Sequence, residues 1–174
     1  MTLATLYITA LRVIHIFAAV TWVGGGIFFA SVVLPTVKEA EQDGARFMLR
    51  LAAAGRMSRN LTISAVLTVL AGALLFWPTS GGLNSAWLKT PSGISLTIGA
   101  IIGILAAGDG AFRTGRIAQK LGLLASDILA RKGPPPPELL QQAQALGAKL
   151  QSGAMLSVAL GALALFFMAA SPAL

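Results

Sequence analysis

The sequence predicts an all-α fold, a bundle of four transmembrane helices in a single membrane domain that covers residues 1–174. Apolar residues make up 56% of the chain and charged residues only 11%, whereas a soluble domain carries roughly 25% charged residues. Four separate apolar runs are also long enough to cross a bilayer, which takes about 20 residues. Lipid is therefore the solvent that this composition fits.

The four apolar runs cover about residues 6–34, 61–77, 94–112 and 153–170. The first run contains Arg12 and His15 as its ionisable interruptions besides the weakly acidic Tyr7. No basic segment precedes it, and it is too long for the apolar core of a signal peptide. We therefore expect it to remain in the mature protein as the first span.

Basic residues lie almost entirely in two segments that alternate with the runs. The segments between runs one and two and between runs three and four hold Lys38, Arg46, Arg50, Arg56, Arg59, Arg113, Arg116, Lys120, Arg131, Lys132 and Lys149. Only Arg12 and Lys89 lie on the other side. The positive-inside rule therefore predicts cytoplasmic basic loops and both termini on the outer side. This placement of the +7 net charge argues against a nucleic-acid partner and for the bilayer.

The second basic segment is expected to be helical rather than an open loop. Its apolar residues recur at helical spacing on both sides of a break at residues 133–137. Pro137 suits a first helical position because proline has no N–H to leave unpaired. Helices three and four should therefore extend past the membrane as a cytoplasmic hairpin.

Small residues repeat every fourth position in three of the runs. They are Ser64, Thr68 and Gly72 in the second, Gly99, Gly103 and Ala107 in the third, and Gly153, Ser157 and Gly161 in the fourth. In the first run, residues 24–26 are all glycine. Small side chains let helix backbones approach closely in lipid. We expect a tight bundle, with homodimer contacts as the alternative use of these faces.

His15 and Trp22 are seven residues apart and share one face of the first helix, with only alanine at residues 18 and 19 between them. An ionisable group inside a membrane is expensive to bury and often marks a functional site. Two roles for His15 stay open, namely ligand or proton binding and an ordinary hydrogen bond to a neighbouring helix.

Three other charged residues lie in or beside the runs. Asp109 and Arg113 are four residues apart, which predicts an ion pair on one helix face; the alternative is that Asp109 faces the bundle as a cation or proton site. Arg12 lies within a turn of His15 and is expected to reach the outer headgroups, with anion binding as its alternative.

No catalytic triad or phosphate loop is apparent, and cysteine is absent, which favours a protein that is not an enzyme.

The first run carries a family resemblance. The resemblance lies in three stretches, LRVIHI from Leu11, WVGG from Trp22, and the Leu34–Pro35 dipeptide at the end of the run. This run resembles the first helix of the copper-resistance-D-like four-helix proteins of bacterial inner membranes. It is similar also to the four-helix protoporphyrinogen oxidase family. The resemblance implies His15 as a haem or copper ligand. A bis-histidine haem needs two imidazoles, and this chain has one. A copper ion bound to His15 could also be coordinated by the thioether of Met168. Apart from Met1, Met168 is the methionine whose expected depth in the membrane approaches that of His15.

The sequence thus predicts a bacterial inner-membrane protein that handles a metal ion, haem or a small solute in the bundle, centred on His15 and Trp22. Two alternatives stay open. One is a haem-dependent membrane oxidoreductase. The other is a non-catalytic subunit or assembly factor, in contact with a membrane-protein partner or with further copies of itself.

Overall fold

The computed structural model describes residues 2–171, and this part of the chain consists of helices and turns without a strand. Four of its helices are long and apolar enough to cross a membrane. They are Leu3–Glu39, Arg56–Thr79, Pro91–Ala130 and Pro137–Ala170, and each contains one of the predicted runs. The all-α fold is confirmed, and the four apolar helices are compatible with a multi-pass integral membrane protein.

The first and third long helices each contain π-helical turns. The first comprises α1 (Leu3–Ala19), η1 (Val20–Gly24), α2 (Gly25–Phe28), η2 (Phe29–Val33) and α3 (Leu34–Glu39). The third comprises α7 (Pro91–Gly108), η3 (Asp109–Thr114) and α8 (Gly115–Ala130). The second is α5 (Arg56–Thr79) and the fourth is α9 (Pro137–Ala170). Two shorter helices, α4 (Glu41–Ala54) and α6 (Ser85–Leu88), lie in the connections.

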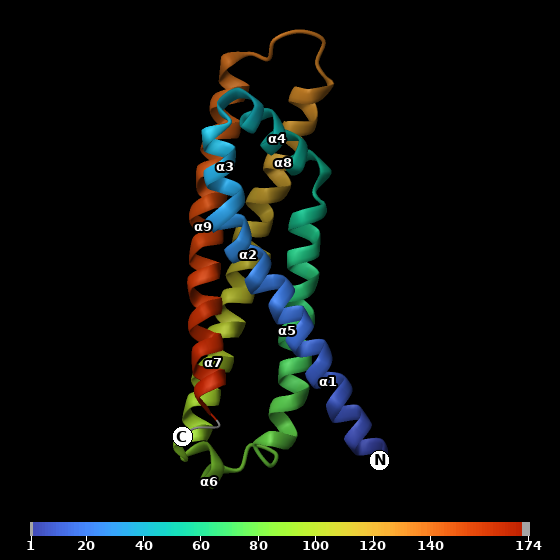
Figure 1. The fold of residues 1–174 in the computed structure, drawn as a ribbon, viewed down its shortest axis with the longest axis vertical. Coiled ribbons are helices and arrows are strands. Elements are labelled where there is room, and N and C mark those ends of the chain that lie inside the picture. The colour runs from blue at the N-terminus through green and yellow to red at the C-terminus, as the bar shows by residue number, and fades with distance from the viewer. Residues whose placement is uncertain (1, 172–174) are drawn as a thin grey trace.

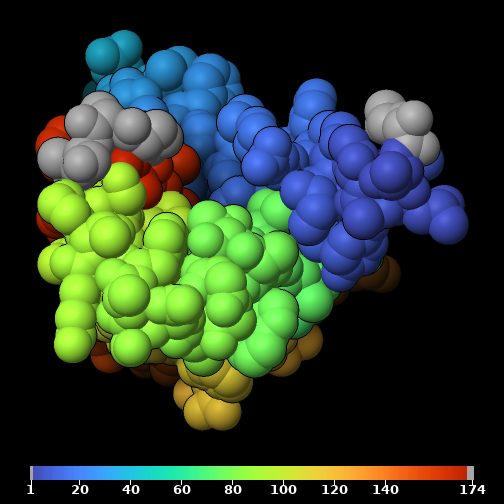
Figure 2. Space-filling view, turned by 90° about the horizontal axis from the view of Figure 1, so that it is seen from below, coloured from blue at the N-terminus to red at the C-terminus, as the bar shows by residue number. Residues whose placement is uncertain are grey.

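The two ends of the bundle differ in charge. One end, here called the basic end, carries α4, the start of α5 and the turn from α8 to α9 (Figure 1). The opposite end, the α6 end, carries the start of α1, the end of α9 and the α5–α7 connection (Figure 1). Figure 2 shows the beginning of α1 projecting beyond the other helices at the α6 end. Side chains at the start of α1, such as Leu3, are accordingly largely exposed.

Proline positions explain several helix boundaries. Pro91 and Pro137 each begin a helix, as predicted for Pro137. The first and second apolar runs end at Leu34 and just before Pro78, but the helices that contain them continue past these residues. The first helix continues through Pro35 to Glu39, because the widened turn η2 directly before it accommodates a residue without an N–H. Similarly, α5 runs one residue beyond Pro78 to Thr79.

The small residues of the four runs pack against other helices of the same chain. A Cβ added to Gly99 would lie 2.9 Å from Met168 Cγ and 3.0 Å from the Ala164 carbonyl oxygen, so α7 and α9 are in close backbone contact. A Cβ on Gly26 would lie 2.7 Å from Val158. The glycines thus serve the intramolecular packing that the sequence predicts.

The outer surfaces of the helices are apolar. Large side chains such as Phe17, Val20, Leu105 and Phe166 are more than half exposed. A soluble protein rarely exposes a continuous apolar surface of this kind, whereas a bilayer solvates it. The helices therefore suit direct contact with membrane lipid.

At the basic end, α4 covers the side of the helical hairpin formed by α8 and α9. Leu121, Ile128 and Ala143 form a buried apolar cluster there, with Leu49 and Ala52 of α4 packed against it. A Cβ on Gly122 of α8 would lie 2.9 Å from the Ala52 carbonyl oxygen. The predicted helical hairpin is present, and α4 is tightly docked on it.

Candidate functional site

The His15 side chain is held between α1 and α5. Its Nδ1 lies 2.8 Å from the backbone carbonyl oxygen of Thr68. A carbonyl oxygen can only accept, so Nδ1 carries the proton and donates it. In the neutral imidazole, Nε2 then has a free lone pair. This is the arrangement in which proteins commonly present histidine to a metal ion, with the second ring nitrogen fixed by an outer hydrogen bond.

Gly72 makes room for the imidazole. A Cβ added to Gly72 would lie 2.9 Å from His15 Cε1 and 3.1 Å from Nδ1, but 3.9 Å from Nε2. The Nδ1–Cε1 edge of the ring therefore faces α5, and Nε2 is the ring nitrogen farthest from Gly72. The small-residue ladder predicted in the second run, with Thr68 and Gly72 one turn apart, creates this seat for His15.

A small cavity of about 30 Å³ lies beside His15. Its lining includes Trp22 on the same helix and Met168 on α9, with Thr68, Gly103 and Gly161 among the small residues around them. About 10–15 Å³ of such space is enough to hold one water molecule, so this cavity has room for one or two. The three side chains that the sequence singled out for ligand binding thus border one space large enough for a single metal ion.

No protein-family model matches this chain, and no curated protein or solved structure is found to be similar to it. The site must therefore be interpreted from its own geometry.

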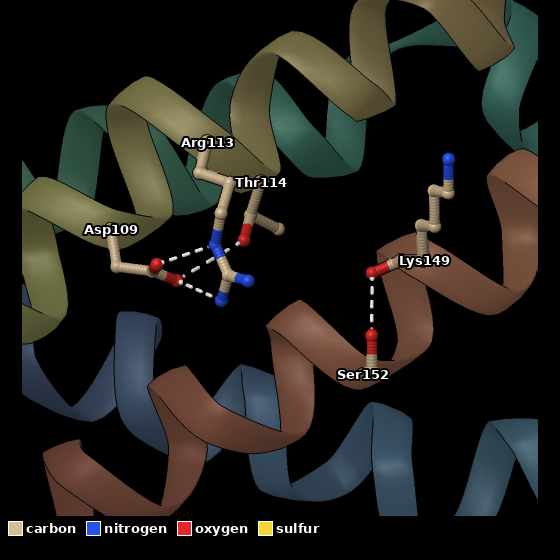
Figure 3. A network of polar contacts seen from close by, with 5 residues as sticks. All are labelled: Asp109, Arg113, Thr114, Lys149 and Ser152. Atoms are coloured by element: carbon tan, nitrogen blue, oxygen red, sulfur yellow. Dashed lines mark hydrogen bonds and ion pairs between the residues drawn. The ribbon is translucent and has the colours of Figure 1, made fainter.

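The remaining polar candidates lie away from this cavity. Arg113 Nε donates to Asp109 Oδ1 at 2.6 Å and Arg113 Nη2 to Asp109 Oδ2 at 3.1 Å, so the ion pair expected from their spacing is present. The Thr114 hydroxyl also points to this carboxylate, at 3.4 Å (Figure 3). Across from them on α9, the Ser152 hydroxyl donates to the Lys149 carbonyl oxygen, and the Lys149 amino group points away (Figure 3). Arg12 is exposed on α1 and does not line the His15 cavity.

A second, larger cavity of about 500 Å³ occupies the half of the bundle toward the basic end and is partly open to the surroundings. We call it the large cavity. It is bordered by the first long helix, α4, α5, the region from η3 into α8, and α9. Of the residues that the structure describes, Trp22 and Val23 border both cavities. The sequence offers no direct signal for the large cavity, whose wall includes Met48 and Met57.

The π-helical turns lie beside this space. The lining of the large cavity includes Trp22 and Val23 of η1, Phe29 of η2, and residues 110, 111 and 114 of η3. A π turn inserts an extra residue into a helix and occurs often at functional sites. Each of these turns shifts the helix face that borders the cavity, and the inserted residues could not be located from apolar periodicity.

Proposed function

We propose that this chain is a copper-resistance-D-like membrane protein that binds one soft monovalent metal ion, Cu(I), among His15, Trp22 and Met168. The observation that carries the proposal is the shared cavity of about 30 Å³ that these three side chains border. They come from α1, η1 and α9, so the fold rather than the local sequence brings them together. The resemblance of the first helix adds support for a copper ligand at His15.

The chemistry of the three side chains suits Cu(I). The imidazole offers Nε2, because Nδ1 donates to Thr68. The thioether of Met168 is a soft ligand that selects Cu(I) over hard cations. The indole of Trp22 can face a monovalent cation with its ring and stabilise it by a cation–π interaction. Among residues 2–171, no carboxylate borders the cavity, so the described part of the chain offers a hard divalent cation no matching ligand there.

Haem does not fit this site. A cavity of about 30 Å³ has no space for a porphyrin, and the single histidine leaves one axial position without an imidazole. The haem-dependent oxidoreductase alternative consequently has less support than a bare ion. A non-catalytic subunit is the alternative that a failure of metal binding would favour.

For orientation, we propose that the basic end faces the cytoplasm of a bacterium and that both termini lie on the outer side. The distribution of lysine and arginine supports this. The extensions of helices three and four, residues 115–130 and 137–152, would then be cytoplasmic. The His15 site would lie in the outer half of the membrane.

The proposal is tested by titrating the detergent-purified protein with Cu(I) against a chromophoric Cu(I) chelator. We expect one ion per chain. His15→Ala and Met168→Leu should each weaken binding at least about tenfold, the scale seen when even an outer-shell partner of a metal site is lost. Met155→Leu is the matched control, because Met155 is half exposed on the same helix and borders neither cavity.

Three outcomes would count against the proposal. Absence of stoichiometric Cu(I) binding would overturn it in favour of the subunit alternative. Equal losses in Met155→Leu and Met168→Leu would place the ion elsewhere. A Soret absorption band that disappears in His15→Ala would instead support haem.

A further inference from the structure

The large cavity has the size and the lining of a binding site for a small molecule. Its volume of about 500 Å³ lies within the range of roughly 300–1,000 Å³ that is usual for such sites. Most of the lining residues are apolar, with Trp22 and Phe29 as aromatic side chains and Met48 and Met57 as flexible ones. Thioethers adapt to irregular or flat ligands and make favourable contacts with rings. An apolar space of this size readily takes up an apolar molecule.

The polar groups on its wall are uncharged. They are Ser58, Thr62, Thr114, Gln144, Gln151 and Ser157, and within the described part of the chain no lysine, arginine, aspartate or glutamate borders the cavity. Burying an ionised group without a charged partner is costly. A carboxylate or phosphate inside the cavity would lack that partner. The lining therefore selects an uncharged molecule with an apolar body and a few hydrogen-bonding atoms.

One hydroxyl on the wall lacks a partner. The Ser157 oxygen is buried and makes no hydrogen bond to any of residues 2–171. Ser157 lies on α9 opposite Gly110 of η3, where a Cβ on the glycine would be 3.8 Å from the hydroxyl oxygen. Leaving a buried hydroxyl without a partner is costly. Ser157 lines the cavity, so a rotation of its side chain about χ1 would be needed to turn the hydroxyl to the cavity surface, where a ligand carbonyl oxygen would accept its hydrogen.

We infer that the large cavity binds an uncharged, lipid-soluble ring compound that bears carbonyl oxygens, the chemical class of a quinone. The cavity is partly open, and its lining runs from Trp22 and Phe29 in the first membrane-length helix into α8 and the first half of α9, so it suits a ligand that dissolves in the membrane and reaches its edge at the basic end. Trp22 and Phe29 provide aromatic surface for the ring, and the Ser157 hydroxyl donates to a carbonyl. This inference does not depend on Cu(I) binding, although Trp22 borders both sites.

The native tryptophans allow a direct test. Trp77 and Trp87 lie near the α6 end, so Trp77→Phe with Trp87→Phe leaves Trp22 as the only indole of the chain. Decylubiquinone added to this detergent-purified protein should quench Trp22 fluorescence in a saturable manner. Dodecanoate, which is anionic, should not compete with it.

Two variants on α9 distinguish the cavity from the detergent-covered surface. Ala154→Phe places a ring in the cavity and should abolish saturable quenching, whereas Ala159→Phe, on an exposed position that does not border it, should leave quenching unchanged. Ser157→Ala keeps the volume and should weaken affinity by about 2- to 10-fold, which corresponds to one hydrogen bond. If Ala154→Phe does not fold, Ala118→Leu on α8, another lining position, takes its place.

The inference is overturned if quenching is not saturable, or if it is the same in the cavity-filling variants as in the parent protein. Competition by dodecanoate at similar concentrations would overturn the uncharged class of ligand. Unchanged affinity in Ser157→Ala would overturn the carbonyl contact. Loss of Cu(I) binding in His15→Ala with quinone binding intact would separate this site from the proposed metal site.

Discussion

The imidazole of His15 lies directly against Gly72, with 2.9 Å between His15 Cε1 and the place that a Cβ of residue 72 would occupy. One turn earlier on α5, the Thr68 carbonyl oxygen accepts the Nδ1 proton at 2.8 Å. A glycine and a backbone carbonyl thus fix both the position and the tautomer of the ring. The orientation of Nε2 therefore depends on Gly72, which leaves the space that the ring occupies.

Gly72→Ala should therefore impair the metal site without removing a ligand. The added methyl group would force the imidazole off the Thr68 carbonyl, and such overpacking typically costs about 1–3 kcal/mol. We expect a lower melting temperature in detergent and a Cu(I) affinity reduced at least about tenfold. Gly108→Ala is the control, since a Cβ there meets no atom within 4 Å. Wild-type affinity in Gly72→Ala would contradict this account of how His15 is held.

A second pair of glycines tests the packing of α7 on α9. A Cβ on Gly99 would approach the Ala164 carbonyl oxygen to 3.0 Å, whereas one on Gly103 would meet ordinary contacts at 3.8 and 3.9 Å. Gly99→Ala should destabilise the protein by about 1–3 kcal/mol. Gly103→Ala should be neutral or stabilise it, because alanine favours the helix by up to about 1 kcal/mol. Unfolding in graded dodecyl sulfate measures both, and equal effects would refute the proposed backbone contact.

The Asp109–Arg113 ion pair should contribute little to stability or binding. Its arginine side chain is 54% exposed and its aspartate 21% exposed, so solvent screens much of their attraction. Asp109→Asn should lower the melting temperature in detergent only slightly and leave Cu(I) affinity unchanged. Asp127→Asn, which breaks the more exposed pair with Arg131, is the matched comparison. A large loss of Cu(I) binding in Asp109→Asn would revive the cation-site alternative for this carboxylate.

The orientation can be measured because the chain has no cysteine. Pro134→Cys places a thiol in the turn between α8 and α9, and Ser85→Cys places one at the start of α6. In intact bacterial cells, a membrane-impermeant maleimide should label residue 85 and not residue 134. Labelling of residue 134 should appear only after the cells are broken. The reverse pattern would contradict the positive-inside assignment.

The helices were the part of the molecule that the sequence predicted best. Their apolar runs are long, and basic residues and prolines mark most of the breaks. The continuation of the first helix through Pro35 was not predicted, because it depends on the widened turn η2. Helical periodicity was enough to predict that His15 and Trp22 share one helix face. Met168 was predicted as a possible ligand from its depth along the fourth run. The contacts of His15 with Gly72 and Thr68 depend on how α1 crosses α5, and the large cavity depends on how several helices pack together. Local sequence patterns do not encode these helix crossings.

The central claim is that one Cu(I) ion is held by an imidazole nitrogen and a thioether sulfur inside the bundle. X-ray absorption at the copper edge of the purified, Cu(I)-loaded protein measures these ligands directly. We expect one imidazole and one sulfur in the wild-type spectrum, with the sulfur lost in Met168→Leu and retained in Met155→Leu. A spectrum without sulfur, or one that Met168→Leu leaves unchanged, would contradict it.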